Sequence, residues 1–92
     1  MLKFKTSARF RKDLKRMRKQ GKNLSLLDSI VIKLRKQETL DEKHRDHPLH
    51  GDLIGFRECH ITPDWLLIYV IDNEALILTA SRTGSHSDLL KK

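Results

Sequence analysis

The chain of 92 residues is poor in cysteine, in aromatic residues and in long apolar runs, and each shortage excludes a class of protein. Its one cysteine, Cys59, cannot form an internal disulfide, which excludes a disulfide-stabilised secreted domain. Its longest apolar run, Trp65 to Ile71, is far shorter than the roughly 20 residues of a membrane-spanning helix. With one Trp, one Tyr and three Phe, it has too few aromatic residues to bind single-stranded nucleic acid broadly by base stacking. Residues 1–5 show no signal-peptide pattern, so we expect a cytoplasmic protein.

Positive charge is abundant and concentrated in the first half of the chain. Residues 1–46 contain 15 Lys and Arg against 6 Asp and Glu, whereas residues 47–92 contain 4 against 6. Such an asymmetric field suits a phosphate backbone or an acidic protein partner. The alternative is a solvated helix face that only improves solubility.

The sequence pattern predicts one α+β domain over residues 1–92. Residues 2–5 alternate as a short strand, and residues 8–20 and 24–37 show helical spacing, so they should form an antiparallel helical hairpin. Residues 38–55 look irregular. Three further strands are predicted at 56–61, 65–71 and 75–82, followed by a helical turn at 87–90. The expected fold is a small antiparallel sheet with an N-terminal strand and the hairpin packed on one face.

A group of residues that can move protons lies near the ends of the predicted strands. His60 and Asp64 follow one strand, Arg82 closes the last strand, and His86 comes four residues later. Strand ends at one edge of a meander converge although they are distant in sequence. His47, which precedes the three strands, is able to join them.

Such a group fits RNA cleavage without a metal ion. That reaction needs a base for the 2′-hydroxyl, an acid for the leaving 5′-oxygen, a cation for the phosphoryl oxygens and in-line placement. Histidine suits acid and base roles, and arginine suits the phosphate. Trp65 or Tyr69 could stack a base. Ordinary roles are equally available: Arg82 could pair with Asp64 or Asp88, and both aromatics could be core residues.

A metal site built from His44, His47 and His50 is not expected. These histidines recur every three residues, but Pro48 breaks any helix there, so they would not line one face. We therefore expect no metal and no cofactor.

Four motifs, in order, resemble the YafQ-type branch of the RelE superfamily of bacterial toxins, and the similarity extends over nearly the whole chain. They are Asp46-His47-Pro48-Leu49, Phe56-Arg57-Glu58-Cys59-His60, Pro63-Asp64-Trp65-Leu66-Leu67-Ile68-Tyr69 and Arg82-Thr83-Gly84-Ser85-His86. The resemblance implies a RelE-like fold and a ribosome-dependent endoribonuclease that cleaves mRNA in the A site. It also implies a cognate DinJ/RelB-like antitoxin, with operator DNA bound only through the antitoxin complex and no role for a membrane.

The resemblance also assigns the candidate site. Its catalytic positions fall on residues that the pattern had already singled out: His47, His60, Asp64, Arg82 and His86. We assign Arg82 to the phosphate, His86 to the general acid, and His60 or Asp64 to the base. Trp65, Leu90 and Arg57 are expected to contact the substrate. Leu90 departs from the family, which often has an aromatic residue there.

Two other functions remain open at this point. The chain could be a non-catalytic module that binds RNA or the ribosome through its basic face. It could also be a degenerate toxin retained as an antitoxin-binding co-repressor.

Overall fold

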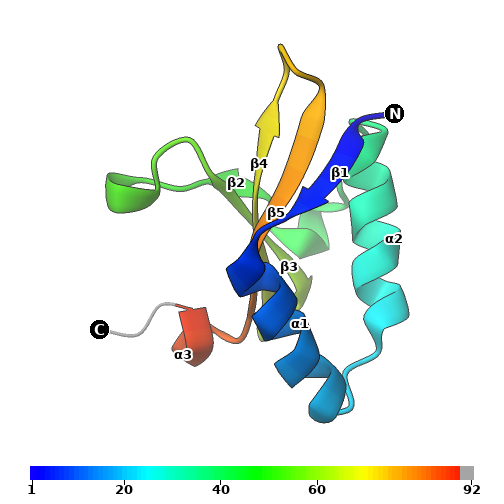
Figure 1. The fold of residues 1–92 in the computed structure, drawn as a ribbon, viewed down its shortest axis with the longest axis vertical. Coiled ribbons are helices and arrows are strands. Elements are labelled where there is room, and N and C mark those ends of the chain that lie inside the picture. Colours follow the sequence, from blue (N-terminus) through cyan, green and yellow to red (C-terminus); the bar gives the residue numbers. More distant parts are fainter. Residues whose placement is uncertain (90–92) are drawn as a thin grey trace.

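The computed structural model describes residues 1–89, in which two helices cover one face of a five-stranded sheet of order β1-β5-β4-β3-β2 (Figure 1). The strands are β1 (Lys3–Thr6), β2 (His47–Pro48), β3 (Arg57–Thr62), β4 (Trp65–Asp72) and β5 (Ile77–Gly84). The helices are α1 (Ala8–Lys19), α2 (Leu24–Arg35) and α3 (His86–Leu89), with short 3-10 helices η1 (Glu42–His44) and η2 (Gly51–Leu53). The predicted α+β fold is confirmed.

Both long helices begin at polar caps that the sequence supplies. The Ser7 Oγ accepts a hydrogen bond from the backbone N–H of Phe10 at 2.9 Å, and the Asn23 Oδ1 accepts one from Ser25 at 3.1 Å. Such caps satisfy backbone donors that the first helical turn leaves free. Gly21 then takes φ of 77° after α1, where a side chain would be strained. Within residues 1–89, no helix is long and apolar enough to cross a bilayer.

The core lies between the helices and one face of the sheet. Apolar residues of α1 and α2 meet alternate residues of β3, β4 and β5 there, among them Phe10, Met17, Leu27, Ile30, Cys59, Trp65, Leu67, Tyr69 and Leu78. Side chains alternate along a strand, so Leu66 and Ile68 of β4 point to the opposite face, where they are also buried. That second face carries the site.

The structure corrects three details of the predicted fold. The sheet is mixed, because β1 pairs parallel with β5 while the other pairings are antiparallel. Residues 38–55 are not wholly irregular, since they contain η1, β2 and η2. β5 begins two residues later than expected, because the Asp72 Oδ1 accepts hydrogen bonds from Glu74 and Ala75 and extends the turn before it.

Candidate active site

One row of paired residues crosses four strands on the sheet face opposite the helices. His47 of β2 pairs with Glu58 of β3, Glu58 pairs with Ile68 of β4, and Ile68 pairs with Arg82 of β5. Directly paired residues in neighbouring strands point to the same face of a sheet. His60, two residues beyond Glu58, shares that face as well. Strand pairing therefore gathers residues that are up to 35 positions apart in the sequence.

Glu58 is the centre of this group, and the sequence pattern alone did not single it out. Its side chain is only 5% exposed, and its Oε1 lies 3.6 Å from Nε2 of His60 and 3.9 Å from Nε2 of His47. A buried carboxylate is costly unless it is paired, and here two imidazoles supply the partners. The available signal was the strand alternation, which places Glu58 beside His60 on one face.

His86 completes the group from the first residue of α3. Its ring centroid lies 5.5 Å from that of His60, and its Nδ1 lies 3.8 Å from Oδ1 of Asp64. The His60 Nδ1 lies 3.3 Å from the carbonyl oxygen of Pro63, which can accept a hydrogen bond from it. Half of the His86 side chain is exposed, and Asp64 is exposed further. The predicted convergence of His47, His60, Asp64 and His86 is thus present in the structure.

These histidines line an open cleft of about 580 Å³ with two cations that the sequence pattern did not assign. Its walls comprise Lys43, Arg45, His47, Glu58, His60, Pro63 and His86. Lys43 and Arg45 are exposed and lie in or next to η1. A cleft lined by imidazoles and by exposed cations suits a phosphodiester, because the cations attract it and the imidazoles can exchange protons with it.

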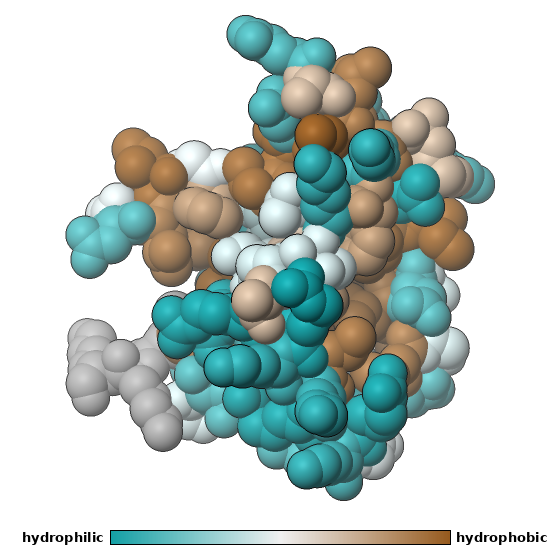
Figure 2. Space-filling view, viewed as in Figure 1, coloured by the Kyte–Doolittle hydropathy of each residue, from teal (hydrophilic) through white to brown (hydrophobic). Residues whose placement is uncertain are grey.

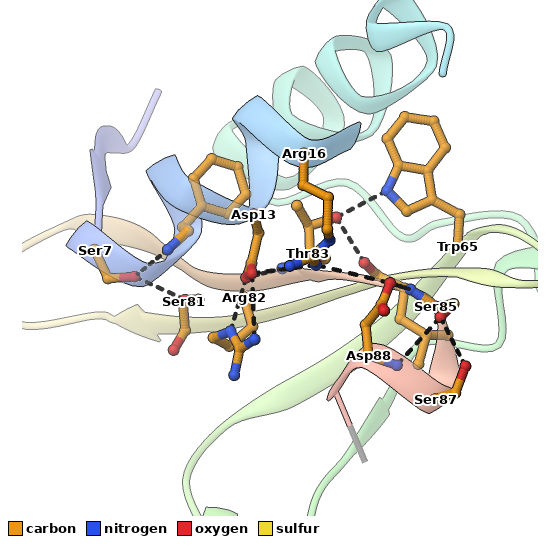
Figure 3. Close-up of polar contacts among 12 residues, drawn as sticks. Ser7, Asp13, Arg16, Trp65, Ser81, Arg82, Thr83, Ser85, Ser87 and Asp88 are labelled. Atoms are coloured by element: carbon orange, nitrogen blue, oxygen red, sulfur yellow. Dashed lines mark hydrogen bonds and ion pairs between the residues drawn. The ribbon is translucent and has the colours of Figure 1, made fainter. Parts of the chain in front are cut away.

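Arg82 shares the face of the row but is not among the residues that line the cleft, and its guanidinium is held from the α1 side. The Nε of Arg82 donates to Oδ2 of Asp13 at 2.7 Å, and its Nη2 donates to Oδ1 at 3.2 Å (Figure 3). This hydrogen bonding raises the pKa of Arg82 above its ordinary value, so the cation is permanent. The sequence suggests Asp64 or Asp88 as its partner; the hydrogen-bonded carboxylate is Asp13, and the charge of Asp88 also raises the pKa of Arg82.

Trp65 corrects the expectation of a substrate contact. It is 1% exposed, belongs to the core between sheet and helices, and donates from Nε1 to the Thr83 Oγ1 at 2.9 Å. Its indole is therefore a packed core group with a satisfied donor, and no base can stack on it without unfolding the core. Tyr69 is buried in the same core.

Arg57 does not line the described cleft. Arg57 pairs with Tyr69 in the sheet and so points to the helix-covered face, where its Nε donates to Asp46 at 3.3 Å. It lines a separate pocket with Arg45, so its predicted substrate contact is not supported. Leu90 lies outside the described residues.

The row also contains a group with the chemistry of a metal site. One ligand atom from each of His47, Glu58 and His60 lies within 4.8 Å of the other two. Imidazole nitrogens and a carboxylate oxygen are the donors that zinc and copper accept in proteins. Of the three histidines considered at the start, only His47 belongs to this group.

The chain is similar to known proteins over nearly its whole length. The chain matches over residues 2–91 the family described as bacterial toxin of type II toxin-antitoxin system, YafQ. The mRNA interferase toxin YafQ of Escherichia coli (strain K12) is 33% identical over 84 residues, which cover 90% of this chain and 89% of the relative.

Solved structures extend the match to the whole fold. A metal-bound toxin from Helicobacter pylori is 47% identical with a TM-score of 0.92, over 97% of this chain and 99% of that one. The toxin in the E. coli DinJ-YafQ complex is 32% identical with a TM-score of 0.87, over 97% and 98%. The chain therefore belongs to the YafQ family of bacterial type II toxins.

Proposed function

We propose that this chain is an endoribonuclease that cleaves messenger RNA in the ribosomal A site and so stops translation. The observation that carries the proposal is the pair of imidazoles of His60 and His86, 5.5 Å apart beside the buried Glu58 carboxylate. The similarity to an E. coli mRNA interferase supports the reaction class. The scarcity of exposed aromatics fits an enzyme whose substrate is positioned by the ribosome.

The reaction is an attack of the 2′-hydroxyl on the adjacent phosphorus. The Glu58–His60 pair takes the hydroxyl proton, the 2′-oxygen bonds to phosphorus, and the bond to the 5′-oxygen breaks. His86, half exposed at the mouth of the cleft, protonates that leaving oxygen. Arg82 stabilises the charge on the phosphoryl oxygens. The products are a 2′,3′-cyclic phosphate, or a 3′-phosphate after hydrolysis, and a 5′-hydroxyl.

His47 and Asp64 support this centre. His47 faces Glu58 from the edge strand, and Asp64 faces His86 from the turn after β3. Each lies within 4 Å of a proton-transferring group and helps to hold it in place. Lys43 and Arg45 line the cleft where the neighbouring phosphates of the strand would lie.

The metal-binding group does not enter this mechanism. The similar H. pylori toxin is metal-bound in its crystal structure, and the His47, Glu58 and His60 donors of this chain fit a zinc or copper ion. A bound ion would supply a Lewis acid and a water of lowered pKa. Because the proposed steps use only side chains, we expect chelated enzyme to keep its full cleavage rate. Restoration of a lost rate by added metal would contradict the metal-free mechanism.

We further propose a DinJ/RelB-like antitoxin as the regulatory partner. The related E. coli toxin has been crystallised with DinJ. An acidic segment of such an antitoxin would be attracted by the exposed cations of α1, which form the hydrophilic area in the lower part of Figure 2. Operator DNA would be bound only through that complex. An enzyme of translating ribosomes acts in the cytoplasm.

The test is induction in cells followed by mapping of transcript 5′ ends. In-frame cuts confined to translated regions support ribosome-dependent cleavage, whereas cuts elsewhere contradict it. With purified ribosomes, a 2′-deoxy sugar at the scissile position should block the reaction. His86→Gln should lower the rate by about 100-fold or more, the usual contribution of an acid or base. His50→Gln, an exposed histidine outside the cleft lining, is the matched control.

The same variants separate the enzyme from a non-catalytic binding module, which the exposed cations of α1 would also suit. A binding module predicts growth arrest that survives the combined loss of His60, Asp64 and His86. A co-repressor predicts antitoxin binding without arrest by the unaltered chain. Arrest that depends on these three residues contradicts both.

A further inference from the structure

The carboxylate that binds the guanidinium of Arg82 belongs to Asp13, which lies on the basic helix α1. Asp13 is the acidic residue of α1, whose other charged residues are Lys and Arg. It is 3% exposed, although α1 is otherwise a surface helix with exposed cations. A buried carboxylate on such a helix requires strong partners, and they come from β5.

Asp13 accepts hydrogen bonds from three residues. Besides Nε and Nη2 of Arg82, the backbone N–H of Thr83 donates to its Oδ2 at 3.1 Å, and Nη2 of Arg16 lies 3.3 Å from its Oδ1 (Figure 3). β1 pairs with β5 only as far as Thr6 opposite Ala80. Beyond that point no strand of the described residues lies beside this edge of β5, and the Asp13 carboxylate accepts the hydrogen bond from the Thr83 N–H that a neighbouring strand would otherwise have accepted.

This arrangement fixes the orientation of the guanidinium. A guanidinium has five N–H donors in one plane, and Asp13 engages the side formed by Nε and Nη2. The plane of Arg82 is then set by α1, and the contact with Asp13 does not use Nη1. A lone arginine on a strand end would instead sample many rotamers.

The same contacts reach the segment that carries His86. Arg16 lies over the backbone there: its Nη2 is 3.4 Å from the Thr83 carbonyl oxygen, and a Cβ on Gly84 would come within 2.9 Å of it. Two residues beyond Gly84 the chain reaches His86, the proposed acid. One carboxylate on α1 thus connects the phosphate-binding cation to the start of the acid's segment.

We propose that Asp13 is a positioning residue for the cleavage reaction, which holds Arg82 in the plane that the phosphate requires and fixes the segment leading to His86. This inference rests on the proposed function. A merely structural ion pair between Asp13 and Arg82 would affect the stability of the protein but not the rate of the chemical step. A displacement of about 1 Å in such a group can cost about 100-fold in rate.

The test compares two links between α1 and β5. Asp13→Asn removes the charge from the link to Arg82. Ser7→Ala removes another link, because the Ser7 Oγ donates to the Ser81 carbonyl oxygen at 2.7 Å without touching Arg82. We expect Asp13→Asn to lower kcat about 10- to 100-fold with KM changed less than about threefold. Ser7→Ala should lower Tm but leave kcat unchanged below that Tm.

Three further measurements make the outcome decisive. On an Arg82→Lys background, which lacks the planar fork, Asp13→Asn should cost less than about threefold in kcat, whereas a structural role would cost the same factor on both backgrounds. Asp13→Glu keeps the charge but moves the oxygens, so its kcat should also fall. In NMR spectra of the unaltered protein, the Arg82 Nε–H should exchange slowly with water.

Equal kcat losses in Ser7→Ala and Asp13→Asn would overturn the proposal, as would rapid exchange of the Arg82 Nε–H. Should Asp13→Asn not fold, Asp13→Glu with full kcat would have the same consequence. The proposed function fails by a different result, namely unchanged cleavage in both Arg82→Lys and His86→Gln.

Discussion

At the scale of single residues, Glu58 is the most sensitive test of the catalytic centre. Its carboxylate is buried between two imidazoles, and Glu58→Gln would keep the shape while removing the charge and the capacity to take a proton. We expect the cleavage rate to fall about 100-fold or more, since a general base contributes that factor. Single-turnover cleavage measures it, with Glu74→Gln, at an exposed turn, as the matched control. An unchanged rate would remove Glu58 from the proton transfer.

Cys59 provides a second prediction at this scale. Its side chain is 0% exposed, and burial raises the pKa of its thiol to about 12. The folded pKa lies above the roughly 8.5 of an unfolded thiol, so the folded state favours the protonated form. This contribution to stability is complete below about pH 8.5 and is lost as the pH rises toward about 12.

We therefore expect iodoacetamide to label native Cys59 at pH 8 far more slowly than the urea-unfolded chain. The free energy of unfolding should also fall more between about pH 9 and 12 than in Cys59→Ala. Mass spectrometry measures the labelling, and urea titrations measure the stability. Labelling at the unfolded rate would contradict the burial of the thiol.

Residues differ in how far the sequence can place them. Alternation along β3 was sufficient to put Glu58 and His60 on one face, but it carried no information on which strand would lie beside them. Asp13 is 69 positions from Arg82, and no local pattern links them. The role of Trp65 was also ambiguous from the sequence, because an aromatic residue at the start of a strand fits the core and a binding surface equally well.

At the scale of elements, the two-residue strand β2 depends on one side-chain contact. Asp46, which precedes it, accepts a hydrogen bond from the Tyr69 hydroxyl at 2.6 Å and one from Arg57 at 3.3 Å. Burial, and then this hydrogen bond, raise the pKa of Tyr69 well above its ordinary value. A strand this short cannot hold its own position, so Asp46 fixes the place of His47 opposite Glu58.

Tyr69→Phe should therefore weaken β2 more than the loss of one surface hydrogen bond would. A hydrogen bond to a charged group contributes about 1.5–3 kcal/mol. For a domain of this size, each kcal/mol lowers Tm by about 4–8 °C. On an Asp46→Ala background the same substitution should have little effect. Calorimetry of the four proteins measures this coupling, and equal Tm losses on both backgrounds would exclude the contact as the cause.

Elements with strong local patterns were predicted to within about two residues, and elements that depend on distant contacts were not. Helices α1 and α2 have caps and apolar stripes of their own. β2 is two residues long and is held by its pairing with β3 and by the contacts of Asp46, and η1 is attached to β3 through the His44 Nδ1, 2.6 Å from the His60 carbonyl oxygen. The parallel pairing of β1 with β5 joins positions 74 apart, so it follows from packing rather than from either strand's sequence.

At the scale of the whole molecule, the cations of α1 are separate from the cleft. They are exposed on one part of the surface, whereas the cleft of His60 and His86 is formed by η1, β2, β3 and α3 and has two cations of its own, Lys43 and Arg45. The sequence alone shows that positive charge is concentrated in the first half of the chain. Only the fold shows that the cations of α1 do not line the cleft. Binding of a polyanion and cleavage of a phosphodiester should therefore respond to different substitutions.

We expect the double charge reversal of Lys12→Glu and Lys15→Glu to raise KM on ribosome-bound mRNA at least tenfold at 150 mM salt and to leave kcat within about twofold. Each phosphate contact adds roughly 0.7–0.9 to the magnitude of the slope of log affinity against log salt concentration. Loss of the contacts of Lys12 and Lys15 should therefore lower that magnitude by about 1–2. The matched control is Lys33→Glu with Lys36→Glu, which makes the same change of charge on and beside α2. If both pairs raise KM equally, net charge is responsible and α1 is not a specific surface. If the charge reversal of Lys12 and Lys15 lowers kcat with KM unchanged, these two lysines act on the chemistry rather than on binding, and their separation from the cleft is wrong.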